Sequence, residues 1–273
     1  MKKNLILIIS LLVSLVLVGV IFSGPKNGKE IDTITESISE DVDGVIVPGS
    51  FGLRVLSLSD DYVKTDIKYP YFLGANEDFN IKIKNTVKTA AIEHKKMSKE
   101  NWQARFQTQQ EGDNIPSVPQ SDDDKFYFFT DFKIAQSNSS YISFVLSYGG
   151  FLGGAHEYEN KVSFAYDVKN QEIIGLKDIF PNDPDYLLNI SIKSKEFLIK
   201  EYATISEEEK AGSSKEAIDA YINNIISAIN EGTIPVEENF STFTFTPDKI
   251  KIYFAQYQVG PYSLGMPEVE IDR

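Results

Sequence analysis

Residues 126–148 read FYFFTDFKIAQSNSSYISFVLSY. Aromatic and β-branched residues dominate both halves of this stretch, which favours extended backbone. Between the halves, the polar run 136–140 (QSNSS) is typical of a turn. We therefore expect two strands, 126–135 and 141–148, that pair as an antiparallel hairpin.

Strand-like segments also lie on either side of this hairpin. Upstream, residues 53–58 alternate partly between apolar and polar, and residues 62–69 form a second extended segment. Pro70 should end this second strand, because proline cannot donate a ladder hydrogen bond. Downstream, residues 158–168 have the same strand character.

The segment 76–110 has helical periodicity instead. Apolar residues recur at every third or fourth position, with one slip after Met97. We therefore expect one long amphipathic helix between the second strand and the hairpin. Its predicted apolar face comprises Phe79, Ile83, Val87, Ala90 or Ala91, His94, Met97, Trp102 and Phe106.

Two shorter helices are predicted in the second half of the chain. The first starts at Asp183-Pro184, with the aspartate as N-cap and the proline in the first turn, and runs to about Tyr202. The second starts with the capping box Ser213-x-x-Glu216, and Gly232 ends it.

The final segment of the chain returns to strand character. Residues 243–245 and 250–254 flank a proline turn and should form a hairpin, and residues 268–271 form a last strand. All the segments together predict an α+β fold of antiparallel strands with helices packed on one side.

The first residues of the chain differ in composition from the rest. Lys2 and Lys3 precede 18 uncharged apolar or small residues, 5–22. As a helix, this run approaches the thickness of the membrane hydrocarbon, and the lysines favour a cytoplasmic N-terminus. We expect an uncleaved single-pass anchor in the cell membrane, residues 1–23, with everything after it extracytoplasmic. A cleaved signal segment, which would give a secreted protein, is the alternative.

Charge and composition exclude several classes of partner and site. Residues 1–29 hold four lysines and no acidic residue, so the rest of the chain has 23 basic and 40 acidic residues, a net charge of −17. Such a charge repels nucleic acid and anionic lipid, and suits a cationic partner. The chain has no cysteine, which excludes thiolate nucleophiles and cysteine-ligated metals. We expect no cofactor and no metal site.

Three segments resemble the PdaC/RsiV-like extracytoplasmic domain superfamily. They are residues 141–157, which include the run GGAHE; residues 164–187; and residues 243–269, which include GPY. This superfamily includes the non-catalytic domain of a peptidoglycan deacetylase and the lysozyme-binding ectodomain of an anti-sigma factor. The deacetylase signature Thr-Phe-Asp-Asp is absent from this sequence. The resemblance therefore implies the binding module without the catalytic domain.

The resemblance and the composition together predict four parts. The anchor is followed by a flexible acidic stalk, residues 24–50, which holds too few apolar residues to fold. A PdaC-like domain, residues 51–150, and an RsiV-like domain, residues 151–273, then form the two-part module.

The two histidines offer little chemistry. His156 and Glu157 begin like the zinc motif H-E-x-x-H, but Asn160 stands in place of the second histidine. A locally hydrogen-bonded histidine at a glycine-rich bend is the simpler interpretation, although such a bend also lets a ligand approach the backbone. His94 is expected to be a surface or half-buried residue of the long helix.

A second candidate segment is residues 256–265. Its Gly-Pro pair can form a rigid loop that presents Tyr262 outward as a binding residue; the alternative is that this tyrosine packs in the core. The candidate ligand-binding residues are Gly153, Gly154, His156, Tyr257, Pro261 and Tyr262.

These observations predict a membrane-anchored binding module without enzymatic activity. Its expected partner is a cell-wall glycan or a cationic lysozyme-like protein. Two alternatives stay open: a wall-active carbohydrate hydrolase that uses an Asp/Glu pair, and a purely structural surface domain.

Overall fold

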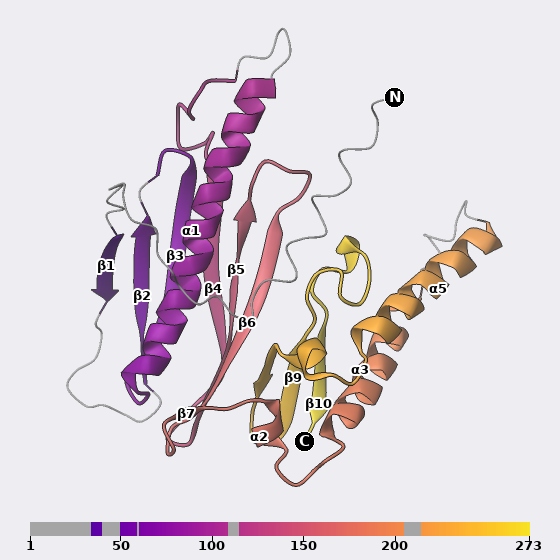
Figure 1. Cartoon of the computed structure of the whole chain (residues 1–273). Helices are drawn as coiled ribbons and strands as arrows, with labels where there is room; N and C mark the ends of the chain where they lie inside the picture. Colours follow the sequence, from indigo (N-terminus) through magenta and orange to yellow (C-terminus); the bar gives the residue numbers. More distant parts are fainter. Residues whose placement is uncertain (1–33, 40–49, 59, 109–114, 205–213) are drawn as a thin grey trace, which may run out of the picture. The chain divides into compact units, whose positions relative to one another are not determined.

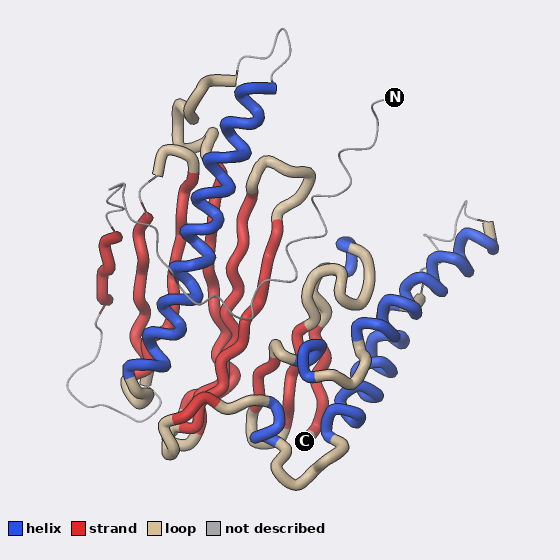
Figure 2. The backbone as a smooth tube through the Cα atoms, in the orientation of Figure 1, coloured by secondary structure: helices blue, strands red, loops and turns tan. Residues whose placement is uncertain are grey.

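The computed structural model describes residues 34–39, 50–58, 60–108, 115–204 and 214–273. In this part of the chain, seven strands form one sheet and three strands form a second sheet (Figure 1). The path of helices and strands along the backbone is clear in Figure 2. The fold is α+β, as predicted.

The large sheet contains the predicted hairpin and has its strands in the order of the sequence. Every neighbouring pair is antiparallel except β3 and β4, which are parallel because a long crossover helix, α1 (Glu77–Thr108), connects them. The prediction of purely antiparallel strands is wrong at this pair. The strands are β1 (Ile34–Ser39), β2 (Phe51–Leu58), β3 (Val63–Phe72), β4 (Phe126–Ser137), β5 (Tyr141–Phe151), β6 (Tyr158–Asp167) and β7 (Glu172–Ile173).

The helix α1 lies along one face of the large sheet (Figure 1). Its predicted apolar face is confirmed up to His94, but Met97 is only half-buried and Phe106 is 37% exposed. The buried line continues instead through Ser98 and Trp102, because residues spaced by four lie on the same side of a helix. The buried apolar core between helix and sheet comprises Leu56, Leu58, Val63, Ile67, Tyr69, Phe72, Phe79, Ile83, Val87, Ala91, Phe128, Ile142, Phe144, Leu146, Phe164 and Tyr166.

The strand β3 continues through Pro70, where the sequence predicts that it ends. Beyond Asp66, β3 and β4 separate, and side chains replace the missing ladder partners. Thr130 Oγ1 accepts from the backbone N–H of Lys68 and donates to its carbonyl, and Asn80 makes the same pair of contacts with Phe72. Pro70 lies between these two positions on the same edge, so no hydrogen-bond donor is needed there.

The second half of the described chain forms the small sheet and the helices that pack on it. The sheet order is β10-β9-β8, all antiparallel, and α3 packs on both β10 and α5. The elements are α2 (Leu176–Ile179), α3 (Tyr186–Tyr202), α5 (Lys215–Gly232), a 3₁₀ turn η2 (Glu237–Phe240), β8 (Phe243–Phe245), β9 (Lys249–Tyr253), a 3₁₀ turn η3 (Tyr262–Leu264) and β10 (Glu268–Asp272). The core here comprises apolar residues of the three strands, Ala165 of β6, and Leu176, Ile179, Tyr186, Ile190, Leu198, Ile225, Ile229, Phe240, Phe254 and Val259.

Both helix starts in this half differ from the prediction. The N-cap of α3 is Asp185; the predicted cap, Asp183, instead accepts from the backbone N–H of Asp185 and from the side-chain amide of Asn189. The N-cap of α5 is Ser214, whose Oγ accepts from the backbone N–H of Ala217 at 3.2 Å. Ser213, which the sequence predicts as the N-cap of this helix, lies outside the described residues.

The predicted anchor, residues 1–23, also lies outside the described residues. Among the helices that the structure describes, none is long and apolar enough to cross a membrane. Of the predicted stalk, Ile34–Ser39 form β1, which pairs with β2 along its whole length, so this part of the stalk is a strand. The large sheet also continues past the expected domain boundary at residue 150, because β6 and β7 complete it.

Hydroxyl groups of the large sheet bind the small one. Ser143 Oγ accepts from the backbone N–H of Phe245 and Ser163 Oγ accepts from that of Phe243, both at 2.9 Å. Nearby, Lys161 Nζ lies 2.9 Å from Glu268 Oε1. These contacts fix the edge of the small sheet against β5 and β6.

Candidate functional site

The structure brings the two candidate segments together as a cluster of three rings, His156, Tyr257 and Tyr262, here called the aromatic cluster. The rings of His156 and Tyr262 stack with centroids 4.6 Å apart and planes 22° apart. The Tyr257 ring lies 6.0 Å from that of Tyr262, at 44°. Tyr257 is 65% exposed, His156 is exposed, and Tyr262 is half-buried. Tyr262 is therefore neither fully outward, as predicted for a binding residue, nor packed in the core, as the alternative predicted.

The loop between β5 and β6 carries the first half of the cluster. Gly153 has φ +81°, and a Cβ there would lie 2.9 Å from the Phe126 ring, so both the backbone angle and the space require glycine. Gly154 has open space around it. The bend that these glycines make turns His156 toward the second segment.

The loop between β9 and β10 carries the second half. Gln258 holds it: its side-chain amide donates to the carbonyls of Gly232 and Asn239, and its Oε1 accepts from the backbone N–H of Ala255. Pro261 then precedes the 3₁₀ turn η3, which starts at Tyr262. This fixed loop presents the tyrosines, and Tyr257 is held at φ +66°, a left-handed angle that non-glycine residues rarely adopt.

Hydrogen bonds connect the aromatic cluster to the large sheet. The Tyr262 hydroxyl donates to the backbone carbonyl of Glu157 at 3.0 Å. Burial, and then the hydrogen bond to the Glu157 carboxylate, raise the pKa of Tyr127 to about 12, so this phenol stays protonated at neutral pH. The Tyr127 ring in turn stacks with Phe151, its cross-strand partner.

Comparison with known proteins finds two family matches along the chain. A family profile described as "Deacetylase PdaC" matches residues 56–158, and one described as "Protein of unknown function (DUF3298)" matches residues 177–273. We call the first matched region the PdaC-type domain and the second the DUF3298-type domain. The resemblance to the PdaC/RsiV-like superfamily is therefore confirmed.

One curated relative is the peptidoglycan-N-acetylmuramic acid deacetylase PdaC of Bacillus subtilis (strain 168), which is 29% identical over 143 residues. The match covers 52% of this chain and 27% of the relative. Two solved structures of DUF3298 family proteins are also similar. The protein from Pseudomonas aeruginosa PAO1 has 14% identity and a TM-score of 0.42, with 88% of each chain covered; the protein from Bacteroides fragilis NCTC 9343 has 15% identity and a TM-score of 0.44, with 89% of this chain and 92% of that chain covered.

The aromatic cluster combines residues from both matched regions. Gly153, Gly154 and His156 belong to the end of the PdaC-type domain, whereas Tyr257 and Tyr262 belong to the DUF3298-type domain. The contact between Tyr262 and Glu157 spans 105 positions of sequence. The cluster therefore exists only when the two domains are in contact.

Sequence reasoning did not identify Tyr127 and Glu157 as part of this region. Tyr127 lies opposite Phe151 in the register of β4 and β5, so the strand alternation contained a signal for its position. Glu157 was considered only as part of an incomplete zinc motif. Among the described residues, no group of three or more histidine, aspartate or glutamate side chains has a geometry that could hold a metal ion.

His94 of the PdaC-type domain is fully buried, whereas the sequence predicted a surface or half-buried residue. The helix face that it occupies packs on β4 and β6, where its ring lies 5.1 Å from that of Phe128 and its Nδ1 lies 2.7 Å from the Tyr158 hydroxyl. Burial lowers the pKa of His94 to about 4. His94 is therefore a neutral core residue at physiological pH.

Proposed function

We propose that this protein is an extracytoplasmic cell-wall protein that binds glycan through the aromatic cluster. The observation that carries the proposal is the cluster of three rings in fixed loops: His156 stacks on the half-buried Tyr262, and the exposed Tyr257 lies tilted beside it. Tyrosine offers a large apolar face and a polar hydroxyl at low entropy cost, which suits the apolar faces and hydroxyl edges of sugars.

Three further features support this proposal. The PdaC-type domain is shared with a peptidoglycan deacetylase, and the N-terminal apolar segment is consistent with export. The Tyr262 hydroxyl already binds the Glu157 carbonyl, so the ring is oriented before a ligand arrives. Such preorganisation reduces the entropy cost of binding.

Calorimetric titration of the full-length protein with soluble peptidoglycan fragments tests the proposal. We expect Tyr257→Ala and Tyr262→Ala to weaken binding about tenfold or more, as for other aromatic binding residues. Tyr221→Ala is the matched control, because Tyr221 is a comparably exposed tyrosine (42%) on α5, outside the cluster. Equal affinity in all three variants would refute the proposal.

A cationic lysozyme-like protein is the second candidate partner, and the charge favours it. Beyond residue 29 the chain carries a net charge of −17, which would steer a basic protein toward it. This candidate makes a different prediction: binding of a basic lysozyme should weaken steeply with added salt, whereas stacking of neutral sugars should not. Release of reducing ends from labelled peptidoglycan would instead indicate the third candidate, a wall-active carbohydrate hydrolase that uses an Asp/Glu pair.

A further inference from the structure

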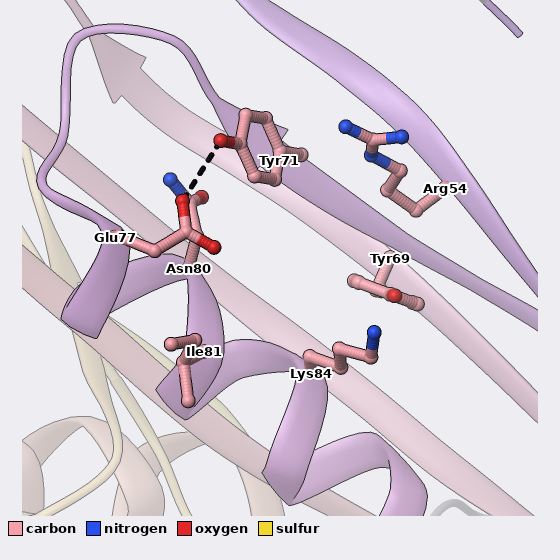
Figure 3. Close-up of a pocket in the computed structure, with 7 residues that line it drawn as sticks. All are labelled: Arg54, Tyr69, Tyr71, Glu77, Asn80, Ile81 and Lys84. Carbon is pink, nitrogen blue, oxygen red and sulfur yellow. Dashed lines mark hydrogen bonds between the residues drawn. The ribbon is translucent and has the colours of Figure 1, made fainter. Parts of the chain in front are cut away.

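Two cations of this chain lie over a tyrosine ring that has a glutamate carboxylate near it. The first is Arg54 of β2, whose guanidinium carbon lies 4.5 Å from the centroid of the Tyr71 ring. The Tyr71 hydroxyl in turn donates to Glu77 Oε2 at 3.0 Å. Figure 3 shows these three side chains in a hollow of the PdaC-type domain.

The second cation is Lys161 of β6, which contacts the small sheet. Lys161 Nζ lies 2.9 Å from Glu268 Oε1 and 5.2 Å from the centroid of the Tyr253 ring. Glu268 and Tyr253 are direct partners in the register of β10 and β9. The negative face of the ring and the charge of the carboxylate both attract a cation, so the combination binds one better than either group alone.

The aromatic cluster has the same two components, tyrosine rings and a glutamate, at the surface. The glutamate is Glu157, which is exposed. Its backbone carbonyl accepts from the Tyr262 hydroxyl at 3.0 Å, and its carboxylate accepts from the Tyr127 hydroxyl. A carboxylate has about four acceptor positions and Tyr127 uses one of them, so the others can bind a ligand.

The ring that a ligand can reach in this cluster is that of Tyr257. His156 stacks on Tyr262 and covers one of its faces, whereas Tyr257 lies tilted beside Tyr262 and is 65% exposed. Tyr127 has a raised pKa, so at neutral pH its hydroxyl keeps the proton that it donates to the Glu157 carboxylate. The carboxylate is thereby held next to the rings.

We propose that the aromatic cluster and Glu157 bind an amino sugar whose amine carries no acetyl group, with the ammonium against the Tyr257 ring and the Glu157 carboxylate. This inference rests on the proposed function, from which it takes the glycan and the cluster, and it adds which sugar of the glycan is preferred. An acetylated amine is neutral, so it lacks the charge that both the ring and the carboxylate attract.

Calorimetric titration of the full-length protein with two matched oligosaccharides tests this inference. The chitosan tetramer, made of glucosamine, and the chitin tetramer, made of N-acetylglucosamine, differ only in their acetyl groups. In mildly acidic buffer the amines of the chitosan tetramer are protonated. We expect the chitosan tetramer to bind about tenfold more tightly than the chitin tetramer.

A pair of charge-matched variants shows whether Glu157 causes the preference. Glu157→Gln keeps an oxygen that accepts from Tyr127 but removes the charge, so it should bind both tetramers about equally and keep the affinity of wild type for the chitin tetramer. Glu172→Gln is the control, because it changes the net charge equally. Glu172 is exposed and pairs with Asp167, at the opposite end of β6 from Glu157, so this variant should keep the preference. Coinciding thermal melts show that both variants are folded.

Two further ligands test the choice of an amino sugar. The loop that carries His156 also has a cation at its other end: Arg105 Nη1 would lie 3.7 Å from a Cβ at Gly153. Tighter binding of N-acetylmuramic acid than of N-acetylglucosamine would show that this arginine sets the preference, and the inference would be wrong. Tetralysine that binds as tightly as the chitosan tetramer would show that any ammonium is accepted, which overturns the choice of a sugar.

The outcomes separate this inference from the proposed function. Equal affinity of wild type for the two tetramers refutes the inference alone, since the rings can still bind an acetylated glycan. The same preference in Glu157→Gln as in Glu172→Gln also refutes it, because the cause would then be the charge of the whole chain. The proposed function fails separately, if Tyr257→Ala and Tyr262→Ala bind the chitin tetramer and peptidoglycan fragments as tightly as wild type.

Discussion

The buried His94 pairs with the half-buried Tyr158 in the PdaC-type domain. His94 Nδ1 lies 2.7 Å from the Tyr158 hydroxyl, and the two rings stack with centroids 5.7 Å apart. The other ring nitrogen, Nε2, has no hydrogen-bond partner in the described part of the chain. A protonated imidazole would therefore place a charge in the core without an acceptor for its second N–H.

This pair should make the protein sensitive to acid. An unfolded histidine has a pKa of about 6.5, whereas His94 in the folded protein has a pKa of about 4. Below pH 6.5 the unfolded state therefore binds more protons, and the free energy of unfolding decreases as the pH falls from about 6.5 to about 4. The full decrease is about 3 kcal/mol. Urea unfolding at pH 7 and at pH 4.5 measures how much the free energy of unfolding has decreased between these two pH values.

His94→Gln isolates this contribution, because glutamine is polar but does not titrate in this range. We expect the variant to lose less stability than wild type between the two pH values, even though carboxylates still titrate in both. His156→Gln changes the other histidine, which is exposed, and should keep the pH dependence of wild type. The same decrease in wild type and His94→Gln would show that His94 is not the cause.

Asn80 should be one of the most sensitive positions of α1. Its buried side chain satisfies the N–H and the carbonyl of Phe72 on the edge of β3 where the ladder with β4 has ended. Asn80→Ala leaves both backbone groups without these partners, so we expect a loss of about 2–4 kcal/mol. Asn85→Ala, at an exposed position of the same helix, should change stability by less than about 0.5 kcal/mol. Equal effects in chemical denaturation would contradict this role.

Two glycines should respond oppositely to alanine. A Cβ at Gly150 would lie 1.9 Å from the Tyr127 carbonyl oxygen and 3.0 Å from His94 Cε1, so Gly150→Ala must displace backbone. We expect a loss of at least about 3 kcal/mol, or no folded protein. A Cβ at Gly154 meets nothing within 4 Å, so Gly154→Ala should melt within a few degrees of wild type. A well-folded Gly150→Ala protein would show that β4 and β5 can separate locally.

The sequence predicted those parts of the fold that depend on local pattern. The aromatic and β-branched content of β4 and β5 and the periodicity of α1 lie within single segments, and the two strands, the helix and its buried face up to His94 are confirmed. The continuation of β3 past Pro70 was not predictable, because it depends on Thr130, 62 positions away from Lys68. The burial of His94 likewise depends on Tyr158, 64 positions away.

In the candidate site, too, the sequence predicted what depends on local pattern and not what depends on distant residues. Glycine and proline patterns indicated both loops, since they are local signals of fixed turns. That His156 and Tyr262 stack on each other depends on how the PdaC-type and DUF3298-type domains meet, and no single segment contains this information.

Tyr257 offers the sharpest test of the aromatic cluster, because its backbone and its ring have opposite effects. The backbone is held at φ +66°, which costs a non-glycine residue about 1 kcal/mol or more. The ring is 65% exposed and contributes little to the core. Tyr257→Gly should therefore relieve backbone strain and raise the free energy of unfolding by up to about 1 kcal/mol, although the greater flexibility of glycine in the unfolded chain offsets part of this gain.

The same substitution removes a ring from the cluster, so glycan affinity should fall about tenfold or more. A variant that is at least as stable as wild type but binds less tightly cannot be explained by misfolding. Tyr257→Ala keeps the strain and should lose affinity without a gain in stability, which separates the two effects. Thermal melts and peptidoglycan titrations of both variants measure this. Wild-type affinity in Tyr257→Gly would show that the exposed ring does not contact the ligand.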